Sequence, residues 1–226
     1  YTLKRSKRKT IGIQISDSAE VIITAPLHAR NSVISDVIEA KSNWIDSKLK
    51  VIKERQQSFK PKIYTNGESF DFLGKAYPLD ILDGSNPITL SSTSLSIGIS
   101  KPKKSVKTEN ELIRAKIIKW YREQAQQYLD NRAHQLAYEI GVTPILIKEK
   151  AFKRSWGMCH SNGKIFINYK LIMAPHEIVD YVIIHELCHL QHPNHSKYFW
   201  SLVAKHCPDY KKHRNWLKDH GHKLDL

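Results

Sequence analysis

The chain has 226 residues, enough for one large domain or two small ones with a substantial hydrophobic core. Its composition is that of a globular protein, with 41% hydrophobic and 26% charged residues, and no segment approaches the roughly 20 apolar residues of a membrane span, so we expect no membrane association. The formal net charge of +14, from 36 Lys and Arg against 22 Asp and Glu, favours an anionic partner such as a nucleic acid or a nucleotide.

The sequence predicts an α+β fold whose first domain, residues 1–107, is basic and rich in β-strands. Alternating apolar residues predict strands, and apolar residues three or four apart predict helices. The expected elements are, in chain order, a basic arm over 4–9, a hairpin of strands at 10–15 and 20–25, two helices between 31 and 57, and further strands between 62 and 100. The charged run over 101–107, which has a proline and no apolar pattern, is the expected linker.

The second expected domain, residues 108–226, consists mostly of helices around a small sheet. It begins with a capping box from Thr108 to Glu111 and a long helix that should end at Gly141. The remaining expected elements are a strand at 145–152, a loop or hairpin connection at 153–163, a partner strand at 164–169, a helix that opens at Pro175, and helices at 195–206 and 209–220.

The helix that follows Pro175 carries the most informative motif of the chain, the sequence H-E-x-x-H formed by His185, Glu186 and His189. Residues four apart lie on the same face of an α-helix, so the two imidazoles can bind one metal ion, and Glu186 can reach a water on that ion. A third histidine, His195, follows six residues later. Three histidines and an open fourth position are typical of a catalytic zinc site, so we expect Zn²⁺ as the cofactor.

Two neighbouring residues are weaker candidates for the third ligand. His192 lies only three residues beyond His189 and precedes a proline, whereas His195 lies at the start of the next expected helix. Cys188 lies within the metal helix but points away from the line that joins His185 and His189, so we assign it to the core. The three cysteines of the chain lack zinc-finger spacing and are expected as reduced thiols of a cytoplasmic protein.

Several segments resemble the YgjP-like zinc metallopeptidase family, which is related to the SprT-like and WLM metalloproteases. The similar segments are residues 154–159, 180–189 and 194–200, together with 8–13 and 72–77, so the resemblance spans nearly the whole chain. It implies a zincin-like catalytic half with a long helix, a small sheet beside the site, the metal helix and C-terminal helices. The implied zinc ligands are His185, His189 and His195, and the implied catalytic residue is Glu186.

The main function hypothesis is a zinc-dependent hydrolase, most simply a metallopeptidase. Zinc would lower the pKa of its bound water to about 7, and Glu186 would take the water proton as a general base and pass it to the leaving nitrogen. A peptide substrate would add as a strand to residues 164–169 or 145–152. The candidates for substrate or oxyanion contacts are Tyr198, Arg154 and His160. The resemblance leads us to expect small serines on both sides of Cys159, where this chain has Met158 and His160. This departure leaves the role of the loop open.

Two alternative functions remain open. One uses the same metal site for a different substrate, and the other depends on the positive net charge of the chain. Some members of the family are described as nucleoside-triphosphate (UTP) pyrophosphatases, in which the same water would attack a phosphoanhydride. The net charge favours this reaction, whereas the sequence lacks a G-x-x-x-x-G-K phosphate loop, and three imidazoles suit zinc better than magnesium. The other alternative is an SprT-like protease that its basic N-terminal half recruits to DNA or RNA.

Overall fold

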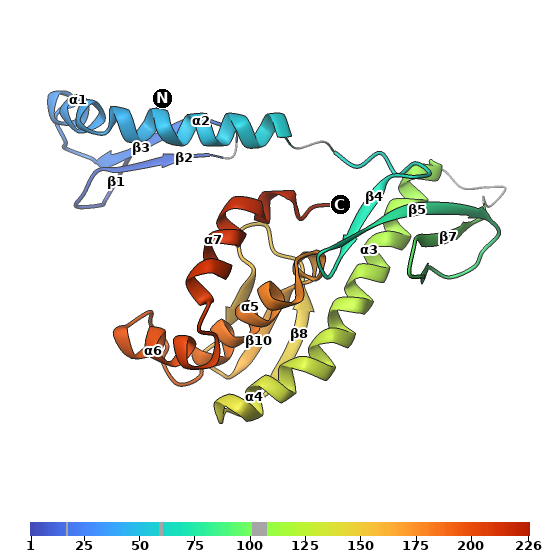
Figure 1. The fold of residues 1–226 in the computed structure, drawn as a ribbon. Helices are drawn as coiled ribbons and strands as arrows, with labels where there is room; N and C mark the ends of the chain where they lie inside the picture. The colour runs from blue at the N-terminus through green and yellow to red at the C-terminus, as the bar shows by residue number, and fades with distance from the viewer. Residues whose placement is uncertain (17, 59–60, 101–107) are drawn as a thin grey trace. The chain divides into compact units, whose positions relative to one another are not determined.

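The computed structural model describes residues 1–16, 18–58, 61–100 and 108–226. The chain divides into two compact units, residues 1–60 and 61–226 (Figure 1). The sequence placed the division at residue 107, within a linker that lies outside the described residues. The structure places it after Lys60, because the strands that follow belong to the same hydrophobic core as the C-terminal helices.

The first unit is a three-stranded sheet with two helices. Its elements are β1 (Thr2–Ser6), β2 (Gly12–Ile15), β3 (Val21–Pro26), α1 (Asn31–Ala40) and α2 (Ser42–Ser58), and the strand order is β1-β3-β2. The expected hairpin is present as the antiparallel pair β2–β3. Ile23, Ala25 and Ile34 form the buried core between sheet and helices.

The start of the expected basic arm belongs to a strand, β1 (Thr2–Ser6), which the sequence analysis did not predict. Strand β1 runs parallel to β3 along the edge of the sheet. The guanidinium of Arg5 donates hydrogen bonds to the carbonyl oxygens of Pro26, Leu27 and Ala29 and to Oδ1 of Asn31, at 2.7–3.3 Å. These bonds join β1 to the β3–α1 connection and so stabilise a strand that alternation alone did not predict.

The second unit begins with a four-stranded sheet of order β4-β5-β7-β6. Its strands are β4 (Ser69–Phe72), β5 (Lys75–Asp83), β6 (Thr89–Leu90) and β7 (Leu95–Ile99). The buried side chains of Phe70, Leu79 and Ile97 belong to one hydrophobic cluster with the long helix of the unit. The phenol of Tyr121 on that helix donates to the Asp71 carbonyl oxygen at 2.5 Å. This shared core is the reason why residues 61–100 do not form part of the first unit.

The long helix of the second unit has three consecutive parts. They are α3 (Glu109–Tyr128), a π-helical turn (Leu129–Ala133) and α4 (His134–Ile140). The predicted capping box is confirmed, because the Thr108 side chain accepts from the Glu111 backbone N–H while the Glu111 carboxylate accepts from that of Thr108. The predicted end at Gly141 is also confirmed, with a φ of 79° that favours glycine.

A second sheet lies beside this helix and has the order β8-β10-β9. Its strands are β8 (Leu146–Lys150), β9 (Gly157–Cys159) and β10 (Lys164–Asn168). We expected the first and last of these segments to be partners across a hairpin. They do pair, but in parallel, and the antiparallel hairpin partner of β10 is the short strand β9.

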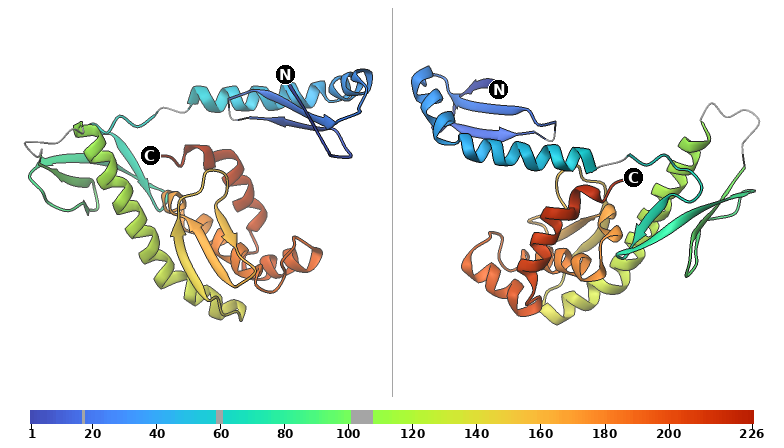
Figure 2. Two further views of the ribbon diagram at one scale, coloured as in Figure 1. Left: turned by 180° about the vertical axis from the view of Figure 1, so that it is seen from behind. Right: turned by 45° about the horizontal axis from the view of Figure 1, so that its top comes forward.

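The C-terminal helices complete the second unit. After a 3₁₀ turn (Tyr169–Met173) come α5 (His176–Cys188), α6 (Lys197–His206), α7 (Tyr210–His220) and a final 3₁₀ turn (Gly221–Lys223). Two further views show how these helices and the sheet are arranged (Figure 2). The predicted α+β class is confirmed, and each helix in the described ranges is too short or too polar to span a bilayer.

Candidate metal centre

Helix α5 holds the motif in the middle of the core. Its apolar side chains face the core on nearly every side, and the buried ones are Ile178, Val179, Tyr181, Val182, Ile183, Ile184, Leu187 and Cys188. Among its buried residues Glu186 is the ionisable carboxylic acid, with an exposed fraction of 7%. A carboxylate in such surroundings is costly unless it has a specific partner, which makes this position chemically distinctive.

The three predicted histidines come together at the C-terminal end of α5. The ligand nitrogens of His185, His189 and His195 all lie within 4.8 Å of one another. The Nε2 atoms of His185 and His195 are 3.1 Å apart. Two nitrogens that bind one tetrahedral zinc at the usual bond length are about 3.3 Å apart. The spacing of these three donor nitrogens therefore fits a single metal ion.

Hydrogen bonding and burial prepare the imidazoles for a metal. Nδ1 of His189 lies 3.1 Å from the His192 carbonyl oxygen, so this nitrogen donates its proton and Nε2 is left free as a ligand. Burial, together with the neighbouring His189 and His195, lowers the pKa of His185 to about 3. Burial also lowers the pKa of His189. Neutral imidazole is the form that binds metals, so protons compete weakly for this site.

The two weaker candidates for the third ligand lie elsewhere. The backbone of His192 contacts His189, while its ring stacks on Tyr198 with 6.3 Å between centroids. Cys188 is fully buried in the core, as expected, and burial raises the pKa of its thiol to about 12.

Helix α6 fixes the third histidine from the side. Ser196 caps the helix by accepting from the Phe199 backbone N–H, so His195 lies just outside the first turn. The ring of Phe199 stacks on His189 at 4.4 Å between centroids, and Trp200 stacks on His195 at 5.6 Å. These apolar rings limit the orientations of the imidazoles and exclude water from one side of the site.

The carboxyl group of Glu186 is poised to gain or lose a proton near neutral pH. Burial raises its pKa to about 7, and a hydrogen bond from the Cys159 backbone N–H opposes the rise. Glu186 packs directly against Gly157 in β9, where a Cβ atom would lie 2.6 Å from both Cγ and Oε1 of the glutamate. Strand β9 therefore positions Glu186 in two ways. Gly157 leaves space for its side chain, and the Cys159 backbone N–H donates a hydrogen bond to its carboxyl group.

A cleft of about 880 Å³ opens over these groups. Its lining includes the three histidines and Glu186, with Val142, Thr143, Gly157, Met158, Cys159, His160, Ser161, Gly163, Leu190 and Pro193. A smaller hollow shares Gly157, His185 and Glu186 with the cleft, and its other lining residues are Trp156, Tyr181, Val182, Arg214, Leu217 and Lys218. His185 and Glu186 thus border both spaces, whereas His189 and His195 line the larger cleft.

The strand that borders the cleft is β9, which corrects the expected substrate strands. Residues 164–169 contain β10, the central strand of the sheet, so its backbone is already paired on both sides. Residues 145–152 contain β8, at the edge remote from β9. Strand β9 was missed because three residues between polar turns give no alternation signal.

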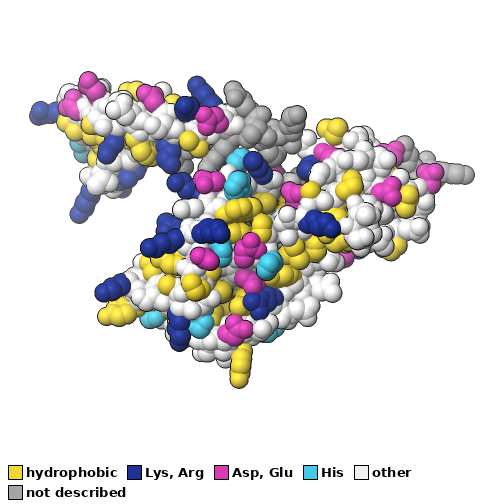
Figure 3. Space-filling view, viewed as in Figure 1, with side chains coloured by type: hydrophobic (Ala, Val, Ile, Leu, Met, Phe, Trp, Pro, Cys, Tyr) yellow, Lys and Arg dark blue, Asp and Glu magenta, His cyan; other side chains and the backbone are white. Residues whose placement is uncertain are grey.

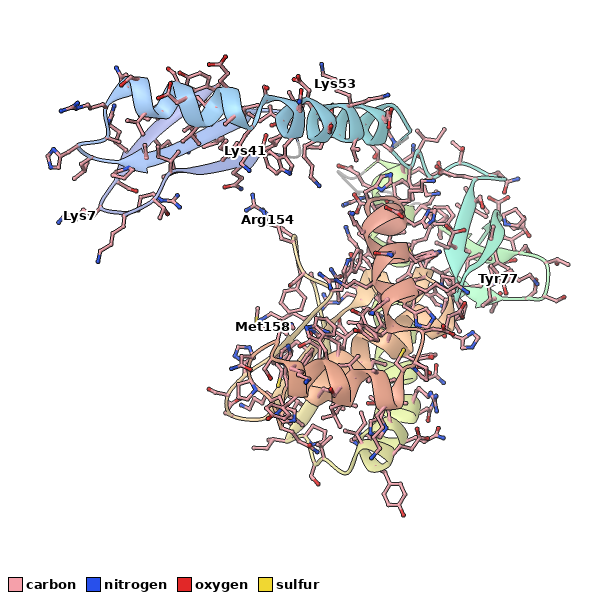
Figure 4. All side chains as sticks on the ribbon, turned by 60° about the vertical axis from the view of Figure 1, so that its left-hand side comes forward. Lys7, Lys41, Lys53, Tyr77, Arg154 and Met158 are labelled. Carbon is pink, nitrogen blue, oxygen red and sulfur yellow. The ribbon has the colours of Figure 1, made fainter. Side chains whose placement is uncertain are left out.

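The three candidate substrate contacts have different positions. His160 is exposed and lines the cleft. Tyr198 is 74% exposed and lies outside the cleft lining. Arg154 is exposed and extends from the β8–β9 connection, as Figure 4 shows, and it too lies outside that lining. Of the three, His160 is therefore the residue nearest to where a reaction would occur.

A buried polar network anchors α5 to the long helix. Oδ1 of Asp180 accepts from the Tyr128 phenol at 2.8 Å, and Oδ2 accepts from Nε and Nη2 of Arg132 at 2.9 and 2.8 Å. Arg132 lies in the π-helical turn, whose extra residue per turn is common at functional sites. The turn brings both donors to one side chain, five residues before the first metal ligand.

The fold and site together define a metallohydrolase-type protein. Two histidines and a buried glutamate come from α5 and its C-cap, and a third histidine comes from the segment just before α6. A comparison with protein families agrees, because the YgjP-like metallopeptidase domain matches residues 9–220. The chain belongs to this YgjP-like family. A search of curated proteins and a search of solved structures gave no match. Membership implies a divalent metal and a hydrolase of the metallopeptidase type.

Proposed function

We propose that this protein is a zinc-dependent metallopeptidase in which Glu186 is the general base. One observation carries the proposal: the buried Glu186 carboxyl group opens into the same cleft as the three histidine nitrogens. Three imidazoles favour zinc over magnesium or calcium, which prefer oxygen ligands. When bound, zinc supplies a Lewis acid that polarises a carbonyl oxygen and acidifies water.

The residues of the chain supply the proton transfers. A pKa of about 7 lets Glu186 accept a proton from the attacking water and return it to the leaving nitrogen at neutral pH. The Cys159 backbone N–H holds the carboxylate in place, and Gly157 leaves room for it. His160 faces the same cleft and is the candidate donor to the developing oxyanion.

The free edge of β9 is the proposed platform for the peptide. The His160 N–H donates to the Lys164 carbonyl oxygen at 2.9 Å, and the Asn168 N–H donates to that of Trp156 at 2.8 Å. Pairing alternates along an antiparallel ladder, so the backbone groups of Gly157 and Cys159 point away from β10. The Cys159 N–H donates to Glu186, so the peptide would pair with the carbonyl oxygens of Gly157 and Cys159. A peptide that adds as a strand there would pass beside Glu186 and the histidines.

The test compares metal-free protein, zinc-reconstituted protein and the Glu186→Gln variant. Casein and a mixed peptide library, read by mass spectrometry, report peptide cleavage, and phosphate release from nucleoside triphosphates reports the pyrophosphatase alternative. We expect zinc-dependent peptide cleavage that Glu186→Gln abolishes while zinc content is kept. The control is Glu177→Gln, on an exposed glutamate of the same helix.

Two results would contradict the proposal. Release of phosphate from UTP with no cleavage of any peptide would identify the pyrophosphatase function in its place. Unchanged cleavage in Glu186→Gln would remove Glu186 from the mechanism.

A further inference from the structure

The sheet β8-β10-β9 of the second unit has two faces of very different character. The inner face, with Ile147, Ile165 and Ile167, is buried in the core beside α5 and α3. The outer face is exposed, and Figure 2 (left) shows the strands from behind with no helix drawn in front of them. The residues that the strand register assigns to it are Leu146, Lys148 and Lys150 of β8, Lys164 and Phe166 of β10, and Met158 of β9, followed by His160. We call this set the outer sheet face.

The outer sheet face is strongly basic. Lys148, Lys150 and Lys164 are all exposed on it. Residues 145–176 contain six Lys or Arg and a single carboxylate, that of Glu149. This carboxylate is buried on the inner face, where it accepts hydrogen bonds from Arg122 at 2.8–3.1 Å. The lysines of the outer sheet face therefore have no acidic residue of their own sheet beside them.

Other parts of the surface are different. On the face drawn in Figure 3, Lys and Arg side chains are interspersed with Asp and Glu. Mixed charges of this kind cancel within a few side-chain lengths and attract no polyanion. The exposed charged side chains of the sheet itself are therefore of one sign, whereas Glu123 and Asp130 of the long helix line the groove beside Leu146 and Lys148.

Aromatic rings lie among these lysines. The ammonium group of Lys150 lies 4.9 Å from the ring centroid of Phe166 and 5.6 Å from that of Phe152. The His160 imidazole meets the Phe166 ring edge-on at 5.5 Å. Half-buried rings between mobile cations are what single-stranded nucleic acids use, because bases stack on the rings while phosphates pair with the cations.

We propose that the outer sheet face binds single-stranded nucleic acid. Phosphates contact Lys148, Lys150 and Lys164, and a base replaces the Lys150 ammonium over Phe166. An acidic peptide would complement the charge of the three lysines equally well, but its carboxylates would not stack on the Phe166 ring. The site adjoins the metal cleft through Met158 and His160, which belong to both. Binding there is independent of hydrolysis and stands even if the proposed function fails.

The test is fluorescence anisotropy of the full chain with a labelled 20-nucleotide oligothymidylate, across a salt series. The variant Lys148→Glu/Lys150→Glu/Lys164→Glu is expected to bind at least about tenfold more weakly, with a slope of log K against log salt reduced by about 2. The matched control reverses the charge of three exposed lysines of α2 and is Lys48→Glu/Lys50→Glu/Lys53→Glu. Lys53 is labelled in Figure 4. We expect this control to change binding by less than about twofold, because the proposal places the phosphates on the lysines of the sheet and not on those of α2.

A second variant tests the ring separately from the charge. Phe166→Leu keeps an apolar side chain at a half-buried position and is expected to weaken binding at least about fivefold without changing the salt slope. Circular dichroism confirms that each variant is folded. Equal losses in the two lysine variants, no binding at low salt, an unaffected Phe166→Leu variant, or equal competition by polyglutamate would each overturn the proposal.

Discussion

A Cβ atom at position 157 would lie 2.6 Å from Cγ and from Oε1 of Glu186, and 2.8 Å from Cδ. Gly157 and Glu186 are therefore complementary, although 28 residues of sequence separate them. Contacts below 3.0 Å require something to shift, and here the shift would fall on the glutamate. The absence of a side chain at this glycine lets strand β9 lie against the face of α5 that carries Glu186.

Gly157→Ala should displace Glu186 from its position and reduce activity by roughly a hundredfold, since small misplacements of a catalytic group have effects of that size. Zinc content should be unchanged, because the three atoms nearest to the added Cβ all belong to Glu186 and none to a histidine. Steady-state kinetics and metal analysis check both expectations. The control is Gly12→Ala, where the added Cβ meets only the flexible end of Arg8. Full activity in Gly157→Ala would contradict the role that we assign to the glycine.

Glu186→Gln should stabilise the metal-free protein at high pH. The folded-state pKa of about 7 lies above the ordinary 4.5, so above pH 7 the folded protein must keep a buried charge that glutamine lacks. The stabilisation should be roughly 2–3 kcal/mol at pH 8.

This stabilisation should depend on pH with a definite sign. As the pH falls from 7 to 4.5, folded Glu186 takes up a proton before the unfolded chain does, and the difference between variant and wild type should disappear. Urea denaturation of chelator-treated proteins at pH 8 and pH 4.5 measures it. A difference that is equal at both pH values would show that burial does not raise this pKa.

His195→Ala and His192→Ala should separate the third ligand from its neighbour. His195→Ala removes one of the three converging nitrogens, so zinc affinity should fall at least about a hundredfold. His192→Ala keeps the backbone carbonyl that contacts Nδ1 of His189, so zinc should remain bound. Metal content after dialysis against a graded series of chelator concentrations is the measurement. Loss of zinc from both variants alike would contradict the assignment.

Asp180→Ala should destabilise the protein by roughly 2–3 kcal/mol, because Tyr128 and Arg132 lose the acceptor they share in a partly buried site. The Asp180 side chain is 13% exposed and that of Arg132 33%, so solvent replaces the lost bonds only in part. Denaturant unfolding gives the value. Lys119→Ala is the control, since its ion pair with Glu123 is highly exposed and should contribute less than about 0.5 kcal/mol. Equal effects of the two substitutions would show that the buried network adds nothing.

Much of the helical half was predictable, since helical signals are local. The capping box at Thr108, the end at Gly141 and the start of α5 at Pro175 each depend on residues within one or two turns. Strand β1 and the parallel pairing of β8 with β10 were not predictable in this way. Each depends on contacts between segments far apart in the chain, such as the hydrogen bonds of Arg5.

By itself, the sequence determined the chemistry of the metal helix. The spacing of His185 and His189 places two imidazoles on one helical face whatever surrounds the helix, because 3.6 residues make one turn. Only the tertiary structure decided which residues lie against that face of α5. It brought Nε2 of His195 to 3.1 Å from Nε2 of His185, placed Gly157 against Glu186 and made β9 the edge strand beside the cleft. Strand order and packing depend on the whole core, and no local pattern encodes them.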